Sequence, residues 1–209
     1  SLHRHVGDQW ELVELQESTV SQWADLDPVI MERVGGLPAQ FSDYLRLKLL
    51  QKHGGLWLDA TVYLTGDLWE ATAVVRTQEA FLFRYAGSRV GSWFFWAAPD
   101  SYVLNAITAV YELWWRQEGR LTNYFLWHDI VEMLYWVDPE YRAAWDDMAE
   151  THPRAALAML GKLSADFDED EFDRLSTGSL IQKLTYKLPP GVEARASFAR
   201  HIVEDGGDR

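Results

Sequence analysis

The sequence predicts an α/β fold in a single domain, with a central, mostly parallel sheet and a helical C-terminal half. Residues 56–64 are almost wholly apolar or β-branched, which is typical of a strand buried on both faces of a parallel sheet. A helical pattern precedes this strand, and helical patterns dominate from residue 100 onward. Because 209 residues suffice for one substantial core and show no internal repeat or linker, we assign residues 1–209 to one domain.

The elements before this strand follow largely from capping signals. Residues 10–15 predict a short strand. Asp27-Pro28 predicts a helix start, because aspartate can cap the first turn and proline suits the first helical position. Gly35-Gly36 ends that helix, Pro38 opens the next, and Gly54 supplies its left-handed cap. Two helices therefore lead into the central strand.

The elements after the central strand begin with short strands and continue as helices. The strands are predicted at residues 73–75, 80–85 and 92–97. The helices are predicted at residues 100–116, at residues 122–136, from Asp138-Pro139 onward, and at residues 154–162. The acidic run at residues 166–173 is typical of a solvated loop or a helix start, and residues 181–188 predict a last strand or a loop over the site.

The composition excludes several classes of protein. A formal net charge of −13 argues against a nucleic-acid partner, because phosphate binding needs a basic surface. The absence of cysteine excludes a disulfide framework, a zinc–thiolate site and a cysteine nucleophile, and it suits a cytoplasmic location. No stretch approaches the roughly 18 to 20 apolar residues that a membrane span requires.

One acid stands inside the apolar run. Asp59 lies in the middle of the predicted strand, and a buried carboxylate costs several kcal/mol unless it is paired or bound to a metal. Asp43 and Arg46 lie three residues apart on the preceding helix and share a face. By themselves they are better explained as a surface ion pair worth about 0.3 to 0.5 kcal/mol. A partner inside the protein, a metal or a bound ligand must therefore compensate Asp59.

The residues around Asp59 resemble a family motif. Ser42-Asp43-x-x-Arg46, followed by Gly-Gly-Leu-Trp-Leu-Asp-Ala-Thr at residues 54–61, is similar to the core of the DXD-type glycosyltransferases, especially the capsular polysaccharide synthesis branch. Residues 124–129 and 183–187 fit the later part of that pattern. The resemblance spans residues 10–190 and implies a GT-A fold, a Rossmann-like single domain that uses nucleotide sugars.

The resemblance implies a catalytic set of Asp43, Arg46 and Asp59. Asp59 matches the first acid of the DXD motif, which is expected at the ribose and the metal. Asp43 matches an acid expected to bond hydroxyl groups of the donor sugar, and Arg46 matches a base expected near the sugar and the diphosphate. Trp57, inside the same motif, is expected to border the substrate. The family pattern also implies a first strand with a tryptophan-rich, nucleotide-contacting motif before residue 10, of which this sequence would lack a part.

The expected metal site departs from the family pattern at Thr61. A hydroxyl stands where a second acid would coordinate Mn²⁺ or Mg²⁺, and a hydroxyl is a poorer ligand. The site then binds metal weakly, recruits another side chain, or relies on cations alone. His128 and Asp129 are the candidates for recruitment, although a helix histidine and acid with local partners explain them equally well. The expected metal ligands are Asp59, Thr61, His128 and Asp129.

Two lysines and a tryptophan complete the predicted substrate site. A C-terminal segment that closes over the diphosphate would supply positive charge through Lys183 and Lys187, and two solvent-facing lysines on a strand are an equal alternative. Trp93 could border the acceptor, but a buried strand explains this residue equally well.

These expectations predict a glycosyltransferase of the hexosyltransferase type. It would move a sugar from a nucleotide-sugar donor, a UDP-sugar, to a polysaccharide or glycan acceptor with retention of configuration, in the cytoplasm or at the inner face of the membrane. Two alternatives belong to other classes. One is a catalytically silent nucleotide-sugar or glycan-binding module; the other is an interaction domain in which Asp59 is paired inside the protein with no ligand cleft above it. A two-carboxylate glycosidase also stays open, because Asp and Glu residues abound.

Overall fold

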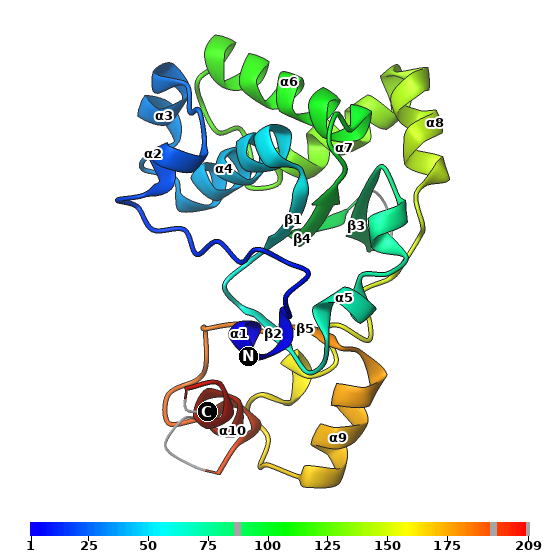
Figure 1. Cartoon of the computed structure of the whole chain (residues 1–209). Coiled ribbons are helices and arrows are strands. Elements are labelled where there is room, and N and C mark those ends of the chain that lie inside the picture. Colours follow the sequence, from blue (N-terminus) through cyan, green and yellow to red (C-terminus); the bar gives the residue numbers. More distant parts are fainter. Residues whose placement is uncertain (86–88, 193–195, 208–209) are drawn as a thin grey trace. The chain divides into compact units, whose positions relative to one another are not determined.

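The chain folds into two compact units. The computed structural model describes residues 1–85, 89–192 and 196–207 (Figure 1). Unit 1 is formed by Ser1–Val13, Leu58–Ala73 and His152–Arg209, and unit 2 is formed by Glu14–Trp57 and Val74–Thr151. The assignment of residues 1–209 to a single domain stays a prediction beside this division.

Unit 2, in its described residues, is built on a three-stranded sheet in the order β1 (Gly55–Leu58), β4 (Val90–Ala97), β3 (Ala80–Arg84). β3 and β4 are antiparallel, with Ala80 opposite Ala97 and a shift of register between Leu82 and Phe83. Helices make up most of the rest: α2 (Val20–Trp23), α3 (Pro28–Val34), α4 (Pro38–His53), η1 (Val75–Thr77), α6 (Tyr102–Gln117), α7 (Leu126–Val137) and α8 (Pro139–Asp147).

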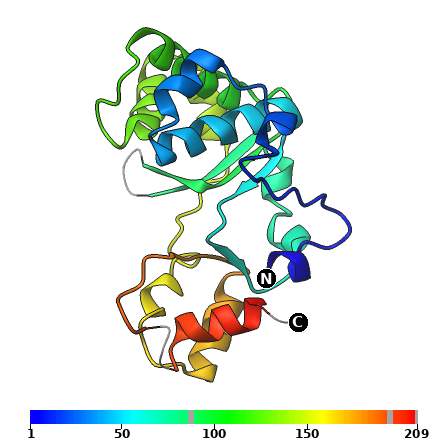
Figure 2. The ribbon, with the colours of Figure 1, turned by 90° about the vertical axis from the view of Figure 1, so that its left-hand side faces the viewer.

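One apolar core holds the helices of unit 2 to its sheet. α4 lies against both β4 and α6 (Figure 1, Figure 2). Tyr44 of α4 and Tyr111 and Trp115 of α6 are fully buried in this core, and the two tyrosine rings stack with their centroids 6.3 Å apart. Burial of large aromatic rings contributes much of the stability of a core. This core therefore holds α4, the helix that carries Asp43 and Arg46, in place.

Unit 1, in its described residues, contains a two-stranded antiparallel sheet of β2 (Val62–Leu64) and β5 (Ile181–Lys183). Its helices are α1 (Leu2–His5), α5 (Leu68–Ala71), η2 (Leu160–Lys162), α9 (Glu169–Gly178) and α10 (Phe198–Gly207). A second apolar core packs Tyr63 of β2 with Met159, Leu175 and Phe198. This core ties β2 to helices that lie more than a hundred residues later in the sequence.

The predicted central, mostly parallel sheet is wrong. The ladders whose register is described, β3 with β4 and β2 with β5, are antiparallel, so the Rossmann-like sheet of a GT-A-type domain is not found. Residues 56–64 form parts of two strands in different sheets, with a turn between them in which the Val62 N–H donates to the Asp59 carbonyl (2.9 Å). The strand breaks there because Asp59 and Thr61 carry polar side chains that need partners a buried parallel sheet lacks.

The capping signals predict two helix starts correctly, since the side chains of Asp27 and Asp138 accept backbone hydrogen bonds at the starts of α3 and α8. Of the two alternatives for the acidic run at residues 166–173, the structure shows a helix start, in which the Asp168 side chain caps α9. Three predicted elements are wrong, because the chain forms loops and turns instead: the strands at residues 10–15 and 73–75 and most of the helix at residues 154–162. None of the helices in the described ranges is long and apolar enough to cross a lipid bilayer.

Candidate functional site

The predicted DXD motif lies on the turn between β1 and β2, in the part of the chain that pairs with β5. The pairing sets Lys183 directly opposite Val62. Two backbone hydrogen bonds anchor the segment of this lysine: the Lys183 N–H donates to the Ala156 carbonyl (2.7 Å), and the Leu184 N–H donates to the Thr61 carbonyl (2.9 Å). The register of β2 with β5 therefore places Lys183, from the C-terminal part of the chain, next to the motif.

Asp59, Thr61 and Lys183 form a cluster of charged and polar side chains in unit 1, which we call the Asp59 cluster. The Lys183 ammonium lies 3.1 Å from Asp59 Oδ2 and also donates a hydrogen bond to Thr61 Oγ1. The lysine side chain is 19% exposed and the aspartate side chain 29% exposed. A hydrogen bond between ionised groups is roughly twice as strong as a neutral one. The cluster is thus a well-held ion pair that solvent still reaches.

The ion pair shows how Asp59 is compensated in the folded chain: Lys183 supplies the opposite charge. Pairing within the protein is one of the two conditions that the interaction-domain alternative requires. The exposed fraction of the carboxylate leaves it accessible to a ligand, so Asp59 is not sealed inside the protein. The structure therefore meets the first condition of that alternative, and the second condition, that no ligand cleft lies above Asp59, stays a prediction.

The Asp59 cluster does not fit a divalent cation in this arrangement. Mn²⁺ or Mg²⁺ would need oxygen ligands from Asp59 and Thr61, and the Lys183 ammonium contacts both side chains. Two unit charges 4 Å apart at a partly exposed site interact by about 4 kcal/mol. Because a divalent cation carries two charges, its repulsion from the Lys183 ammonium would be about twice that energy. Among the described residues, no three His, Asp or Glu side chains gather into a metal-binding group.

Asp43 and Arg46 lie one turn apart on α4 in unit 2. Arg46 forms an ion pair with Asp43 and donates a hydrogen bond to Ser42 Oγ (3.1 Å). Its guanidinium carbon lies 5.3 Å from the ring centroid of Trp57 and 5.8 Å from that of Trp127. The side chains of Arg46 and Asp43 are only 5% and 15% exposed. The pair is therefore largely buried against two aromatic rings, unlike an ordinary ion pair on a helix surface.

His128 and Asp129 lie near the start of α7 in unit 2, and both have hydrogen-bond partners. The Val90 N–H donates to His128 Nδ1 (3.3 Å), and the Asn123 side-chain amide donates to Asp129. The partner of Asp129 is local in sequence, whereas Val90 lies on β4, 38 positions before His128. The metal-binding roles of both residues stay predictions. The other two expected metal ligands, Asp59 and Thr61, belong to unit 1. Neither unit by itself contains all four expected metal ligands.

The pKa of His128 is lowered below its ordinary value of 6.5 by burial first and then by the positive charges of Arg89 and Arg46, while Asp129 opposes the shift. The unfolded chain therefore binds the His128 proton more readily, and stability is lost as the pH falls below the ordinary pKa. We expect the Tm to fall between pH 7.5 and pH 5.5, and to fall less in a His128→Gln variant. The exposed His3→Gln is the control. If the Tm fell equally in the His128→Gln variant, protonation of His128 would not be the cause of the lost stability.

Trp93 and Lys187 differ in their surroundings. Trp93 lies on β4 and is 6% exposed; its ring stacks on that of Phe83, with centroids 4.9 Å apart, and its Nε1–H donates to Tyr85 Oη (3.2 Å). This is the buried-strand placement. Lys187 is exposed, and its ammonium lies 5.8 Å from the ring centroid of Tyr186, which is 78% exposed. The substrate roles of both residues stay predictions.

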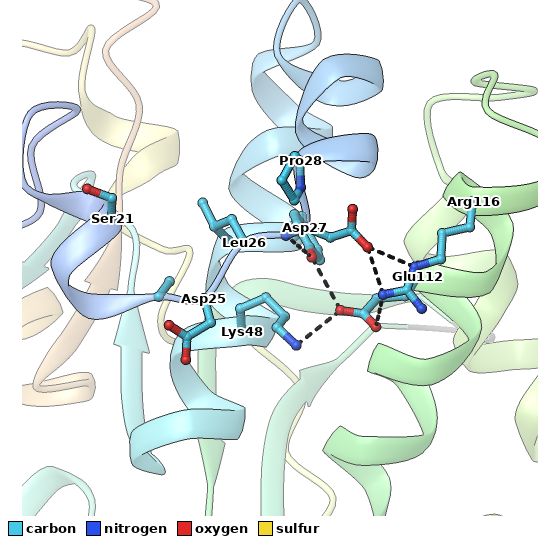
Figure 3. A pocket seen from close by; sticks show the side chains of 10 residues that line it. Ser21, Asp25, Leu26, Asp27, Pro28, Lys48, Glu112 and Arg116 are labelled. Atoms are coloured by element: carbon cyan, nitrogen blue, oxygen red, sulfur yellow. Dashed lines mark hydrogen bonds and ion pairs between the residues drawn. The ribbon is translucent and has the colours of Figure 1, made fainter.

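An open hollow of about 590 Å³ in unit 2 was not predicted from the sequence (Figure 3). Arg116 binds Asp27 (2.8 Å), and Lys48 binds Glu112 (3.0 Å). The Tyr44 hydroxyl contacts Glu112, and burial raises the pKa of Tyr44 to about 12. The hollow thus presents polar side chains, and these four charged residues form two ion pairs whose charges offset each other.

This hollow is hard to predict from the sequence, because the charged side chains that line it can each be explained by a local role within one helix. Asp27 is a helix cap, and a backbone N–H of α3 is the largest cause of its lowered pKa. Lys48 lies in the C-terminal half of α4, and its ammonium donates to Gln51 Oε1 (2.9 Å), three residues further along the same helix. Glu112 and Arg116 are four residues apart on α6, which predicts a helix-surface pair. Only the folded chain brings these segments together.

A comparison with known proteins adds one finding about the whole chain. A family model described as capsular polysaccharide synthesis protein matches residues 1–202. No curated protein matches the sequence, and no solved structure matches the fold. Because the family model covers nearly all of the 209 residues, the chain belongs to the capsular polysaccharide synthesis protein family.

Proposed function

We propose that this protein is a glycosyltransferase that moves a sugar from a nucleotide-sugar donor, a UDP-sugar, to a growing polysaccharide or glycan. Membership of the family supports the coarser statement, a role in polysaccharide biosynthesis. The donor, the acceptor and the retaining outcome are parts of the proposal.

One observation carries the proposal: the Asp59 cluster joins two segments of the motif that lie far apart in sequence. Asp59 and Lys183 are separated by 124 positions, yet the ammonium contacts both the aspartate and the threonine of Asp-Ala-Thr. A partly exposed acid beside a lysine offers an acceptor for ribose hydroxyl groups and a cation for the diphosphate. These are two of the functions that a nucleotide-sugar site must combine.

The proposed chemistry needs little beyond positioning and charge neutralisation. As the bond between the sugar and the diphosphate breaks, negative charge develops on the leaving phosphate, and a fixed cation stabilises that charge. In a retaining transfer, the leaving phosphate oxygen can take the proton of the acceptor hydroxyl, so no separate base is needed. For Asp43 and Arg46 we propose the roles that the motif implies, at the sugar hydroxyl groups and the diphosphate.

A thermal-shift screen of nucleotide sugars tests the proposal. A donor present at about 100 times its Kd stabilises the folded chain by about 2.7 kcal/mol. For a chain of this length, that corresponds to a rise in Tm of roughly 5 to 10 °C. We expect a UDP-sugar to produce this rise, and nucleotide-free sugars to produce none. If no nucleotide sugar raises the Tm, the proposal fails.

Turnover separates the transferase from the catalytically silent module. The purified chain is incubated with the donor that gives the largest shift, and release of UDP is measured with and without a glycan acceptor. A transferase releases UDP, by transfer or by slow hydrolysis. Binding without any release of UDP would favour the silent nucleotide-sugar-binding module.

A further inference from the structure

We propose that Lys183 takes the place of the divalent cation in the donor site, so that the protein binds its nucleotide without a metal. The inference rests on the proposed function, because it concerns how the same site holds a nucleoside diphosphate. Three observations on the Asp59 cluster support it: where the ammonium lies, the charge of the cluster, and how firmly the lysine is held.

The ammonium of Lys183 lies where a bound cation would have to lie. It is 3.1 Å from Asp59 Oδ2 and donates to Thr61 Oγ1. These oxygens belong to the two residues that stand at the acid positions of the motif. An ammonium has three N–H donors, and among the described residues these two contacts use two of them. The third is left for a phosphate oxygen.

The charge of the cluster suits a hydroxyl group, rather than a second acid, at residue 61. Two carboxylates and a dication give a net charge of zero, and so do one carboxylate and one ammonium. With Thr61 in the second position, Asp59 and Lys183 already balance. A second acid there would leave the cluster negative beside a diphosphate, whereas a hydroxyl accepts a hydrogen bond from the ammonium without adding charge. The hydroxyl at Thr61 and the ammonium of Lys183 therefore belong to the same arrangement, in which one carboxylate is balanced by one cation.

The lysine is held by its strand rather than by the ion pair alone. Lys183 follows Gln182, which is fully buried. The Gln182 side-chain amide donates to the carbonyls of Leu175 (3.1 Å) and Ser179 (3.0 Å), and its oxygen accepts from the Met159 N–H (3.3 Å). The antiparallel register then fixes the next residue opposite Val62. A cation positioned in advance loses little freedom when the ligand arrives.

Calorimetry of UDP and GDP binding, in EDTA and in Mn²⁺, tests the inference on the full chain. For the nucleotide that binds, the wild-type Kd is expected to agree within about twofold between the two conditions. In EDTA, Lys183→Met is expected to weaken binding about ten- to a hundredfold, because it removes a charge-assisted hydrogen bond. Lys183→Arg keeps the charge and retains part of the affinity.

Lys162→Met is the matched control, because Lys162 also lies 3.1 Å from an acid, Glu171, in the same unit. It removes the same charge and should leave the Kd unchanged. Thermal melts establish that each variant is folded. A Lys183→Met variant that binds as tightly as wild type in EDTA would overturn the inference.

A double variant provides a readout that a merely structural role of Lys183 would not move. Thr61→Asp combined with Lys183→Ala restores two acids and removes the ammonium, so nucleotide binding should become dependent on Mn²⁺. Binding that is indifferent to Mn²⁺ in this double variant would argue against the inference. Wild-type binding that requires Mn²⁺ would overturn the inference and leave the transferase proposal standing. If wild type bound neither nucleotide in either condition, the proposed function would fall as well.

Discussion

Replacing Asp59 by asparagine is expected to lower the affinity for UDP at least about 100-fold, which is about 2.8 kcal/mol. The carboxylate is proposed to accept hydrogen bonds from the ribose hydroxyl groups, and the neutral amide does so less strongly. The substitution also releases the Lys183 ammonium, which lies 3.1 Å from Asp59 Oδ2. Isothermal titration calorimetry with UDP measures the effect directly.

The control for this variant is Asp170→Asn, which neutralises an exposed acid on α9 in the same unit. It should leave the affinity for UDP unchanged. The free energy of unfolding of Asp59→Asn should fall only slightly, because ion pairs that solvent reaches contribute little. If Asp59→Asn binds UDP as tightly as wild type, or more tightly, Asp59 only balances the charge of Lys183 and is not a donor-binding residue.

Replacing Arg46 by methionine is expected to destabilise the fold by about 3 kcal/mol or more, because removal of one partner of a largely buried ion pair is strongly destabilising. The Asp43 side chain, 15% exposed, would keep its charge with little water to solvate it. The cation–π contacts with Trp57 and Trp127 would also be lost. Urea unfolding followed by tryptophan fluorescence measures the loss.

Arg174→Met is the matched control, since Glu171 and Arg174 form an acid–arginine pair at the same i,i+3 spacing, with the arginine side chain 67% exposed. That substitution should cost less than about 0.5 kcal/mol. The double variant Asp43→Asn with Arg46→Met should cost less than the sum of its parts, because both charges of the ion pair are then removed together. Equal costs for Arg46→Met and Arg174→Met would show that burial does not strengthen the Asp43 pair.

Local signals predict a good part of this fold. Asp27 and Asp138 identify helix starts because an N-cap works through its immediate neighbours in sequence. The strands β3 and β4 follow from their apolar and aromatic runs. The break in the run at residues 56–64 could not be predicted in this way, because one long buried strand and two short strands have the same apolar character. The choice depends on partners for Asp59 and Thr61 that lie more than a hundred residues away.

The candidate site was predictable in its residues but not in its contacts. Asp59 stands out as an acid in an apolar run, and Lys183 lies in the segment at residues 183–187 that fits the later part of the family pattern. Their contact depends on the register of β2 with β5, which no local pattern gives. Trp127 was missed as a partner of Arg46 for the same reason. It reads as one apolar residue of a helix stripe, and only tertiary packing brings its ring to the guanidinium.

The interleaving of the two units has a consequence for how the protein is made. Unit 1 is assembled from three separate stretches of chain, the last of which begins at His152. During synthesis on the ribosome, the segment with Asp59 emerges long before its partner strand, and contacts between distant residues form slowly. A nascent chain arrested before β5 would carry the motif without its counter-charge. The Asp59 cluster therefore forms only after most of the chain has been synthesised. Progressive truncation from the C-terminal side would remove Lys183, and with it the cluster, before any residue of unit 2 was lost.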